Sequence, residues 1–305
     1  PKVHGTGDGS VRLGYKGDVT NTNLSYNGYI YPYYSDVTED KRYGDSYGSL
    51  LRTVNESKGR WAGHQIMLSE DVRISERAIA KVNLNRSGNN APTTAMIDDF
   101  RKFDDAEPYS SMASRASETT GTRQYSANIN YTHTFDESLS QELTVNADYN
   151  HTRSDASNLQ RNLYTALSPA AQAERDASLA AGLADPFLGN GLNDSTFRRA
   201  NIWSLKVDFA QNLWSNTGRV EAGAKAAVSI TDNRYSTYKW TPPTPEEQVG
   251  ELSARNDFTY SEQIYALYVN LSKAFSEKWN AQVGLRGEYT VPRGDWKSEN
   301  RRSGK

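Results

Sequence analysis

The chain has 305 residues, with 35 Lys and Arg against 37 Asp and Glu, so its formal net charge is -2. This balance argues against a nucleic-acid-binding protein, which normally carries a strongly basic face. The sequence contains no Cys, which excludes disulfides, thiolate metal sites and cysteine nucleophiles. Its mean hydropathy is -0.79, and no apolar run approaches the ~20 residues of a membrane helix.

Taken in chain order, the sequence repeatedly alternates apolar and polar residues, which is the period of a β-strand with two different faces. The clearest case is 279–290, where apolar or small residues have one parity and polar residues the other. The other alternating segments are about 9–15, 125–132, 143–149, 203–209, 220–230 and 265–272. We predict about ten long antiparallel strands in a single domain over 1–305, because nothing in the sequence marks a second domain.

The connections between these segments are of two kinds. Short polar turns are predicted at 16–18, 75–77, 136–138, 215–218 and 276–278, each closing a hairpin. Long polar segments, predicted as loops, occupy about 34–58, 87–121, 154–198 and 236–256. Short and long connections therefore alternate along the chain.

One long connection also contains a helix signal. Ser168 can cap the helix, Pro169 suits its first position, and an Ala-rich run continues to Ala181 before Gly182 ends it. The last long connection carries Pro242 and further prolines, which would break a strand ladder and suit an exposed loop.

An antiparallel sheet with one apolar and one polar face fits two architectures. In a soluble sandwich the apolar face packs inward, whereas in an outer-membrane barrel it meets lipid and the polar face lines the lumen. Three features favour the barrel: runs of ~9–14 residues, the alternation of short and long connections, and aromatic residues near both ends of the apolar runs. We therefore predict an all-β segment of a transmembrane barrel, with short periplasmic turns and long extracellular loops.

This interpretation assigns side chains to two faces and two interfaces. The lipid-facing residues are predicted to be Leu143, Val145, Leu205, Val207, Ala224, Val228, Leu267, Val269, Val283 and Leu285. The polar residues predicted to face the lumen are Glu142, Asp148, Lys206, Asp208, Glu221, Lys225, Arg286 and Glu288. The aromatic residues predicted to lie at the membrane interfaces are Phe135, Trp214, Phe275, Trp279, Tyr260 and Tyr289. Because the lumen-facing charges are mixed, they suit a wide, plugged lumen better than a narrow selective filter.

The direction of the strands leads to an expectation about the whole protein. If the short turns are periplasmic, the first strand begins and the tenth ends on the outer side, whereas barrels of this kind normally keep both ends in the periplasm. We therefore expect the chain to be an excerpt of a barrel roughly twice its size.

The residues of the last strands carry a family resemblance. The stretches 258–275 and 279–290, together with 206–213 and 220–225, resemble the barrel of TonB-dependent outer-membrane receptors of the Bacteroidetes type. The motif Gly-Leu-Arg-x-Glu-x-Thr, from Gly284 to Thr290, is moderately specific, because it recurs across many TonB-dependent barrels. The resemblance implies a barrel of about twenty-two strands, a plug domain and a TonB box, although neither of the last two is recognisable in this sequence.

For the whole protein, the resemblance implies nutrient uptake across the outer membrane of a Gram-negative bacterium. The expected partners are outer-membrane lipid, the plug, the remaining strands and, through the plug, the TonB complex. No nucleic-acid partner is expected.

The sequence offers no convincing catalytic or metal-binding motif. It contains no nucleophile elbow, and the four histidines, His4, His64, His133 and His151, are not spaced as ligands of one metal. We therefore expect no enzyme activity, metal or cofactor. Two other interpretations stay open: a ten-stranded outer-membrane enzyme such as a surface protease, and a soluble β-rich adhesin or carbohydrate-binding module.

Overall fold

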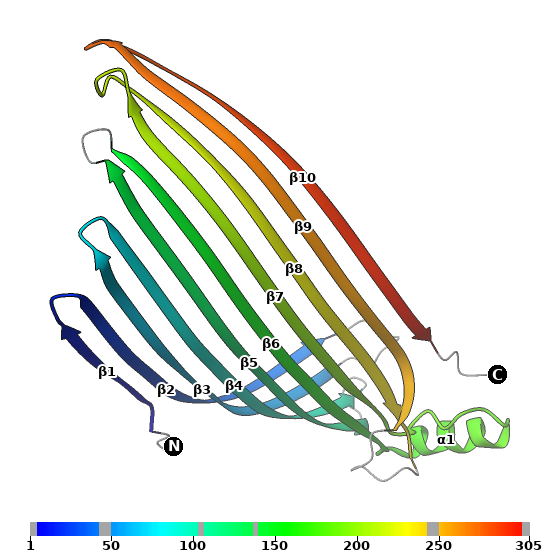
Figure 1. Ribbon diagram of the computed structural model, residues 1–305. Helices are drawn as coiled ribbons and strands as arrows, with labels where there is room; N and C mark the ends of the chain where they lie inside the picture. The colour runs from blue at the N-terminus through cyan, green and yellow to red at the C-terminus, as the bar shows by residue number, and fades with distance from the viewer. Residues whose placement is uncertain (1–4, 43–49, 103–106, 137–139, 243–249, 301–305) are drawn as a thin grey trace.

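The computed structural model describes residues 5–42, 50–102, 107–136, 140–242 and 250–300. These residues form ten strands and one helix, and the ten strands make up a single curved sheet (Figure 1). The elements in chain order are β1 (Gly7–Lys16), β2 (Thr20–Arg42), β3 (Leu50–Ser75), β4 (Ala78–Lys102), β5 (Pro108–Asp136), β6 (Gln141–Ala166), α1 (Pro169–Ala180), β7 (Asn190–Leu213), β8 (Gly218–Trp240), β9 (Glu251–Ser276) and β10 (Trp279–Asn300).

The strands follow one another in space in the order in which they occur in the chain. Each pairs antiparallel with its sequence neighbours, from β1 at one edge to β10 at the other. Directly paired residues of an antiparallel sheet point to the same face, so the register carries the parity of one strand through all the others. The predicted antiparallel sheet of about ten strands is confirmed for the described residues.

The short connections lie together at one end of the sheet, at the upper left of Figure 1. The predicted turns at 16–18, 75–77, 215–218 and 276–278 all fall between paired strands, each within a residue or two of its predicted position. At the turn predicted for 136–138, residues 137 and 138 lie outside the described residues, and the flanking strands β5 and β6 pair as a hairpin.

The prediction of long loops was wrong in extent. Strands continue through most of 34–58, 87–121, 154–198 and 236–256, and the described ladder is interrupted only around α1 and at short gaps. β5 alone has 29 residues, or about 95 Å at ~3.3 Å per residue, against the ~9–11 residues that cross a membrane. The segments were mistaken for loops because both of their faces are polar, so that no alternation marks them as strands.

The predicted helix is confirmed at its two ends. The Ser168 side chain accepts a hydrogen bond from the Ala171 backbone N–H, Pro169 occupies the first turn, and Gly182 has a φ of 71° just past the end. Tyr109 of β5 donates a hydrogen bond to the Glu174 carboxylate, which ties α1 to the sheet and raises the pKa of Tyr109 to about 12. No helix in the described ranges is long and apolar enough to cross a membrane.

The sheet is a single layer, and its apolar side chains are distributed opposite to those of a soluble protein. On β9 the Leu267 side chain is 69% exposed, whereas Ala266, on the opposite face, is 3% exposed. Among the described residues, the buried apolar side chains are few: Ala78, Ala166, Ala171, Trp240 and Ala266. The described residues therefore form no interior core that would hold them together in water, and many of their large apolar side chains are exposed.

We call the apolar face of Leu267 the outer face and the opposite face the inner face. Four rows of directly paired residues cross β8, β9 and β10 on the outer face. Their members on β9 are Leu271, Val269, Leu267 and Tyr265. The next outer-face residue of β9 is the polar Gln263. It lies eight residues from Leu271, or about 26 Å along the strand. The apolar part of the outer face is thus a band of membrane-like width beside the short turns.

We predict that residues 1–305, produced alone in buffer without detergent, will be insoluble or aggregated. The apolar outer face has no partner, and β1 and β10 are unpaired edges of the described sheet, which are templates for association. Size-exclusion chromatography with and without detergent micelles measures this. A monomer that unfolds cooperatively in plain buffer would contradict the prediction.

Candidate functional site

The register gathers the polar residues predicted to face the lumen on one side of the sheet. Lys206 lies opposite Asn146 on β6 and opposite Lys225 on β8, and Lys225 lies opposite Ala266 on β9. Each of the eight residues has the parity of this row. The inner face therefore contains Glu142, Asp148, Lys206, Asp208, Glu221, Lys225, Arg286 and Glu288.

A chain of side-chain hydrogen bonds crosses four strands on this face and meets at Asp148. Asn83 of β4 donates to Asn128 of β5 over 3.3 Å, and Asn128 donates to the Asp148 Oδ1 atom over 2.6 Å. From the other side, the Ser204 hydroxyl of β7 donates to Asp148 Oδ2 over 2.9 Å. Asp148 thus uses both carboxylate oxygens to join its two neighbouring strands.

A hollow of 470 Å³ on β1 to β7 is lined by three members of this hydrogen-bonded chain, Asn83, Asn128 and Asp148. Most of the residues that line it have the inner parity, and half of the lining is amides or hydroxyls, with Asp148 and Arg12 as its charged groups. Such a lining offers hydrogen-bond donors and acceptors to a polar solute without a strong net charge. No three His, Asp or Glu side chains of the described residues gather closely enough to hold a metal ion.

A second polar cluster lies on β7 and β9. The Lys206 Nζ atom is 2.7 Å from Asp208 Oδ2, and the Tyr268 hydroxyl donates to Asp208. The cation of Lys206 also lies 5.7 Å from the centre of the Tyr268 ring. Lys225, directly opposite Lys206, has no ion pair among the described residues.

The remaining charged residues pair along their own strands. Arg286 donates to Glu288 over 2.7 Å on the edge strand β10, and Arg219 donates to Glu221 over 2.8 Å on β8. Glu142 accepts a hydrogen bond from Thr144 over 3.2 Å. Because the two ion pairs are about half exposed, each contributes little to stability. Together these residues give the inner face a hydrophilic surface with charges of both signs.

The ten residues predicted to face lipid all lie on the outer face. The row Val145–Val207–Ala224–Leu267 crosses four strands in direct register, and Val269 lies opposite Leu285 in the row beside it. Leu143, Leu205, Val228 and Val283 have the same parity. In the structure none of these ten side chains is buried.

The aromatic residues predicted for the interfaces are divided between the two faces. Near the short turns, Phe135, Phe275 and Trp279 are exposed and have the outer parity, and Lys273 lies 4.6 Å from the centre of the Trp214 ring. Tyr289 has the outer parity at the far side of the apolar band.

Tyr260 does not fit this assignment, because it lies opposite Thr231 on the inner face and donates a hydrogen bond to Glu262. Its position along the chain had suggested the interface, but its parity places it on the polar wall.

Sequence reasoning missed Asn83, Asn128, Ser204 and Tyr268 as members of the wall. Each is an uncharged polar residue in an ordinary alternating strand, so nothing distinguishes it until the register brings it beside Asp148 or Asp208. Residue counts from the turns could have found them, since paired residues of a hairpin lie at nearly equal distances from its turn.

Residues 137–305, more than half of the chain, match the model of a family described as outer membrane protein beta-barrel family. A comparison with the curated proteins found no match.

We predict that Asp148→Ala, in the folded protein, will lower the free energy of unfolding by about 1 kcal/mol. The substitution removes the acceptor of two hydrogen bonds, and this effect is modest because water reaches the site. Asn150→Ala is the control, since Asn150 has the same face and strand but accepts only from Thr152 on its own strand. Denaturant unfolding in detergent compares the two variants, and equal losses would show that the cross-strand chain has no special weight.

Proposed function

The chain belongs to the outer membrane protein beta-barrel family, and from this membership we propose that it forms part of the wall of a transporter for a nutrient. The family places the protein in the outer membrane. There the apolar band of the outer face contacts lipid, and the polar inner face borders the lumen.

The observation that carries the proposal is the size and chemistry of the inner face. Ten described strands form a sheet whose edges, β1 and β10, do not pair with each other, so further strands would be needed to close it. A barrel of more than ten strands encloses a wide space. The inner wall offers amides, hydroxyls and charges of both signs, which suit passage of a polar solute around a plug rather than selection by a narrow ring of like charges.

The finer form of the proposal is a TonB-dependent receptor with about twenty-two strands. It is supported by the likeness of 258–275 and 279–290 to that family, and by strands that extend far beyond the apolar band. Extended strands of this kind would carry a substrate-binding rim well outside the membrane. The partners in this proposal are a plug inside the lumen and the TonB complex, which would act on the plug. We propose no catalytic role for the chain.

The soluble adhesin and the ten-stranded enzyme are less well supported than the transporter. A soluble adhesin needs a second layer against the apolar face, and the described residues form one layer whose apolar side chains are exposed. A ten-stranded enzyme needs β1 to pair with β10, and in the described sheet these strands are its two separate edges.

Conductance of the full-length protein in planar lipid bilayers tests the transport proposal. A plugged transporter should show no steady ion conductance in its native state, because the plug fills the lumen. Mild urea, which would release a plug before it unfolds the barrel, should then open a large and reversible conductance. A steady open conductance of the native protein would mean a passive pore and would overturn the proposal.

The assignment of the two faces is tested by adding a charge to adjacent residues. In the full-length protein in lipid bilayers, Val283→Arg should lower the free energy of unfolding by roughly 2–4 kcal/mol, since a cation at mid-membrane depth meets hydrocarbon. Gln282→Arg is the matched control on the inner face of the same strand, where the new charge meets water, and its cost should be much smaller. A larger cost for Gln282→Arg would mean that the faces are assigned the wrong way round, and equal costs would mean that the two faces do not meet different media.

A further inference from the structure

Three arginines face one another across adjacent strands on the outer face. Arg123 of β5 lies directly opposite Arg153 of β6, and Arg153 lies directly opposite Arg199 of β7. Directly paired residues have Cβ atoms ~5 Å apart, where like charges destabilise a sheet. A row of three arginines is therefore unfavourable unless anions offset it. The residues are 30 and 46 positions apart in the sequence, so only the register reveals the row.

The protein compensates two of the three charges itself. Arg153 makes two hydrogen bonds to Asp155, of 2.9 and 3.1 Å, and Arg199 binds Asp232 of β8 at 2.7 Å. Arg123 is exposed and makes no hydrogen bond or ion pair within the described ranges. Within these ranges the charge of Arg123 is therefore not compensated by an anionic side chain.

A second cation lies beside Arg123. Arg86 of β4 is exposed, and its guanidinium lies 5.6 Å from the centre of the Tyr125 ring, two residues from Arg123 on β5. Among the described residues no carboxylate pairs with Arg86. The ring contacts the guanidinium without neutralising it, so the adjacent strands β4 and β5 each carry a cation without a carboxylate partner on this part of the outer face.

The two cations lie just beyond the apolar band, on the side away from the short turns. The Tyr149 and Trp203 rings, 5.4 Å apart, end the apolar band on β6 and β7, and the arginine row follows four residues beyond, about 13 Å along the strands. Amphipathic rings settle at the edge of the hydrocarbon layer, and the polar headgroup layer begins just outside it. The order along the outer face is therefore apolar, aromatic and then cationic.

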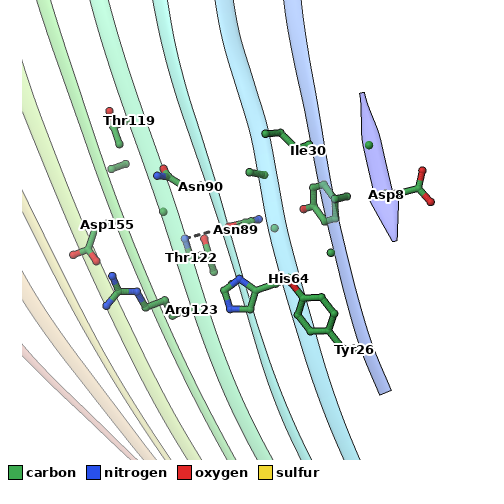
Figure 2. Close-up of a pocket in the computed structure, with 18 of the residues that line it drawn as sticks. Asp8, Tyr26, Ile30, His64, Asn89, Asn90, Thr119, Thr122, Arg123 and Asp155 are labelled. Atoms are coloured by element: carbon green, nitrogen blue, oxygen red, sulfur yellow. Dashed lines mark hydrogen bonds between the residues drawn. The ribbon is translucent and has the colours of Figure 1, made fainter. Parts of the chain in front are cut away.

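A groove of 1140 Å³ runs beside Arg123 (Figure 2). Most of the residues lining it have the outer parity, and these include the glycines Gly28 of β2, Gly88 of β4 and Gly121 of β5. Its apolar lining includes Val11, Tyr26 and Ile30, and its polar lining includes Arg123 and Asp155. The groove thus joins apolar and cationic surface, as an amphipathic ligand requires.

We propose that Arg86 and Arg123 bind the phosphate of a membrane lipid whose headgroup reaches this groove at Arg123. Guanidinium groups bind phosphate oxygens through paired, charge-assisted hydrogen bonds. The lipid is favoured over a free phosphate ion because the site is on the outer face, next to the apolar band, and because part of the groove lining is apolar. The inference rests on the outer-membrane family of the chain and does not depend on the transport proposal.

Native mass spectrometry of the full-length protein, delipidated in detergent, tests this with two probes. Phosphatidylglycerol is the anionic phospholipid, and phosphatidylcholine, with no net charge, is the neutral one. The double variant Arg86→Gln with Arg123→Gln should weaken phosphatidylglycerol binding by about tenfold or more, since each cation near a lipid surface contributes substantially. Binding of phosphatidylcholine should be weak and unchanged.

Arg198→Gln is the matched control, because Arg198 is the neighbour of Arg199 but has the inner parity, opposite Ser154. It removes the same charge from the same height of the barrel and should leave phosphatidylglycerol binding unchanged. An equal loss in this control would overturn the proposal. Displacement of phosphatidylglycerol by inorganic phosphate at similar concentration would also overturn it, in favour of a free-anion site.

A thermal measurement separates binding from a structural role. In neutral detergent, Arg123→Gln should leave the melting temperature unchanged or raise it, because it relieves repulsion in the arginine row. In phosphatidylglycerol bilayers the same substitution should lower it, because the bound lipid is lost. A decrease of equal size in both media would mean that Arg123 serves folding alone, and would overturn the proposal.

Discussion

Everything in this structure depends on the backbone hydrogen-bond ladder and the parity that it imposes. In lipid, water cannot satisfy N–H and C=O groups, so each strand must pair with its neighbours along the whole membrane-crossing part. Once the strands are paired, a residue's parity decides whether its side chain meets hydrocarbon or water. A slip of one residue would exchange Leu267 with Ala266 and place the apolar band in the lumen, which is why the register is so strongly fixed.

The sequence allows prediction of those parts of the fold in which the two faces meet different media. Between Val283 and Leu285, or between Lys206 and Asp208, each second residue changes its environment, and the alternation reveals both the strand and the face. The signals for turns and helix ends are also local in the sequence, so Ser168 and Gly182 predict the ends of the helix without knowledge of the sheet. The face of each polar candidate follows from the same alternation.

Prediction failed where the evidence is not local or where both faces meet water. The outer halves of the strands, such as 108–121, carry Ser and Thr on both faces, so they look like loops although the ladder continues through them. Tyr260 lies close to a predicted loop, which suggests the membrane interface, but its parity puts it on the inner face. The hydrogen-bonded chain at Asp148 and the row of Arg123, Arg153 and Arg199 join residues from several strands, and exact pairing is needed to find them.

The strand order of the sheet is also a statement about how such a protein can change in evolution. Because every strand pairs only with its neighbours in the chain, a hairpin can be duplicated, lost or exchanged without rerouting any other connection. Its two strands bring a complete pair of faces, so the new segment continues the outer band and the inner wall at once. The hairpin is thus a natural module of inheritance, and barrel circumference can grow in steps of two strands.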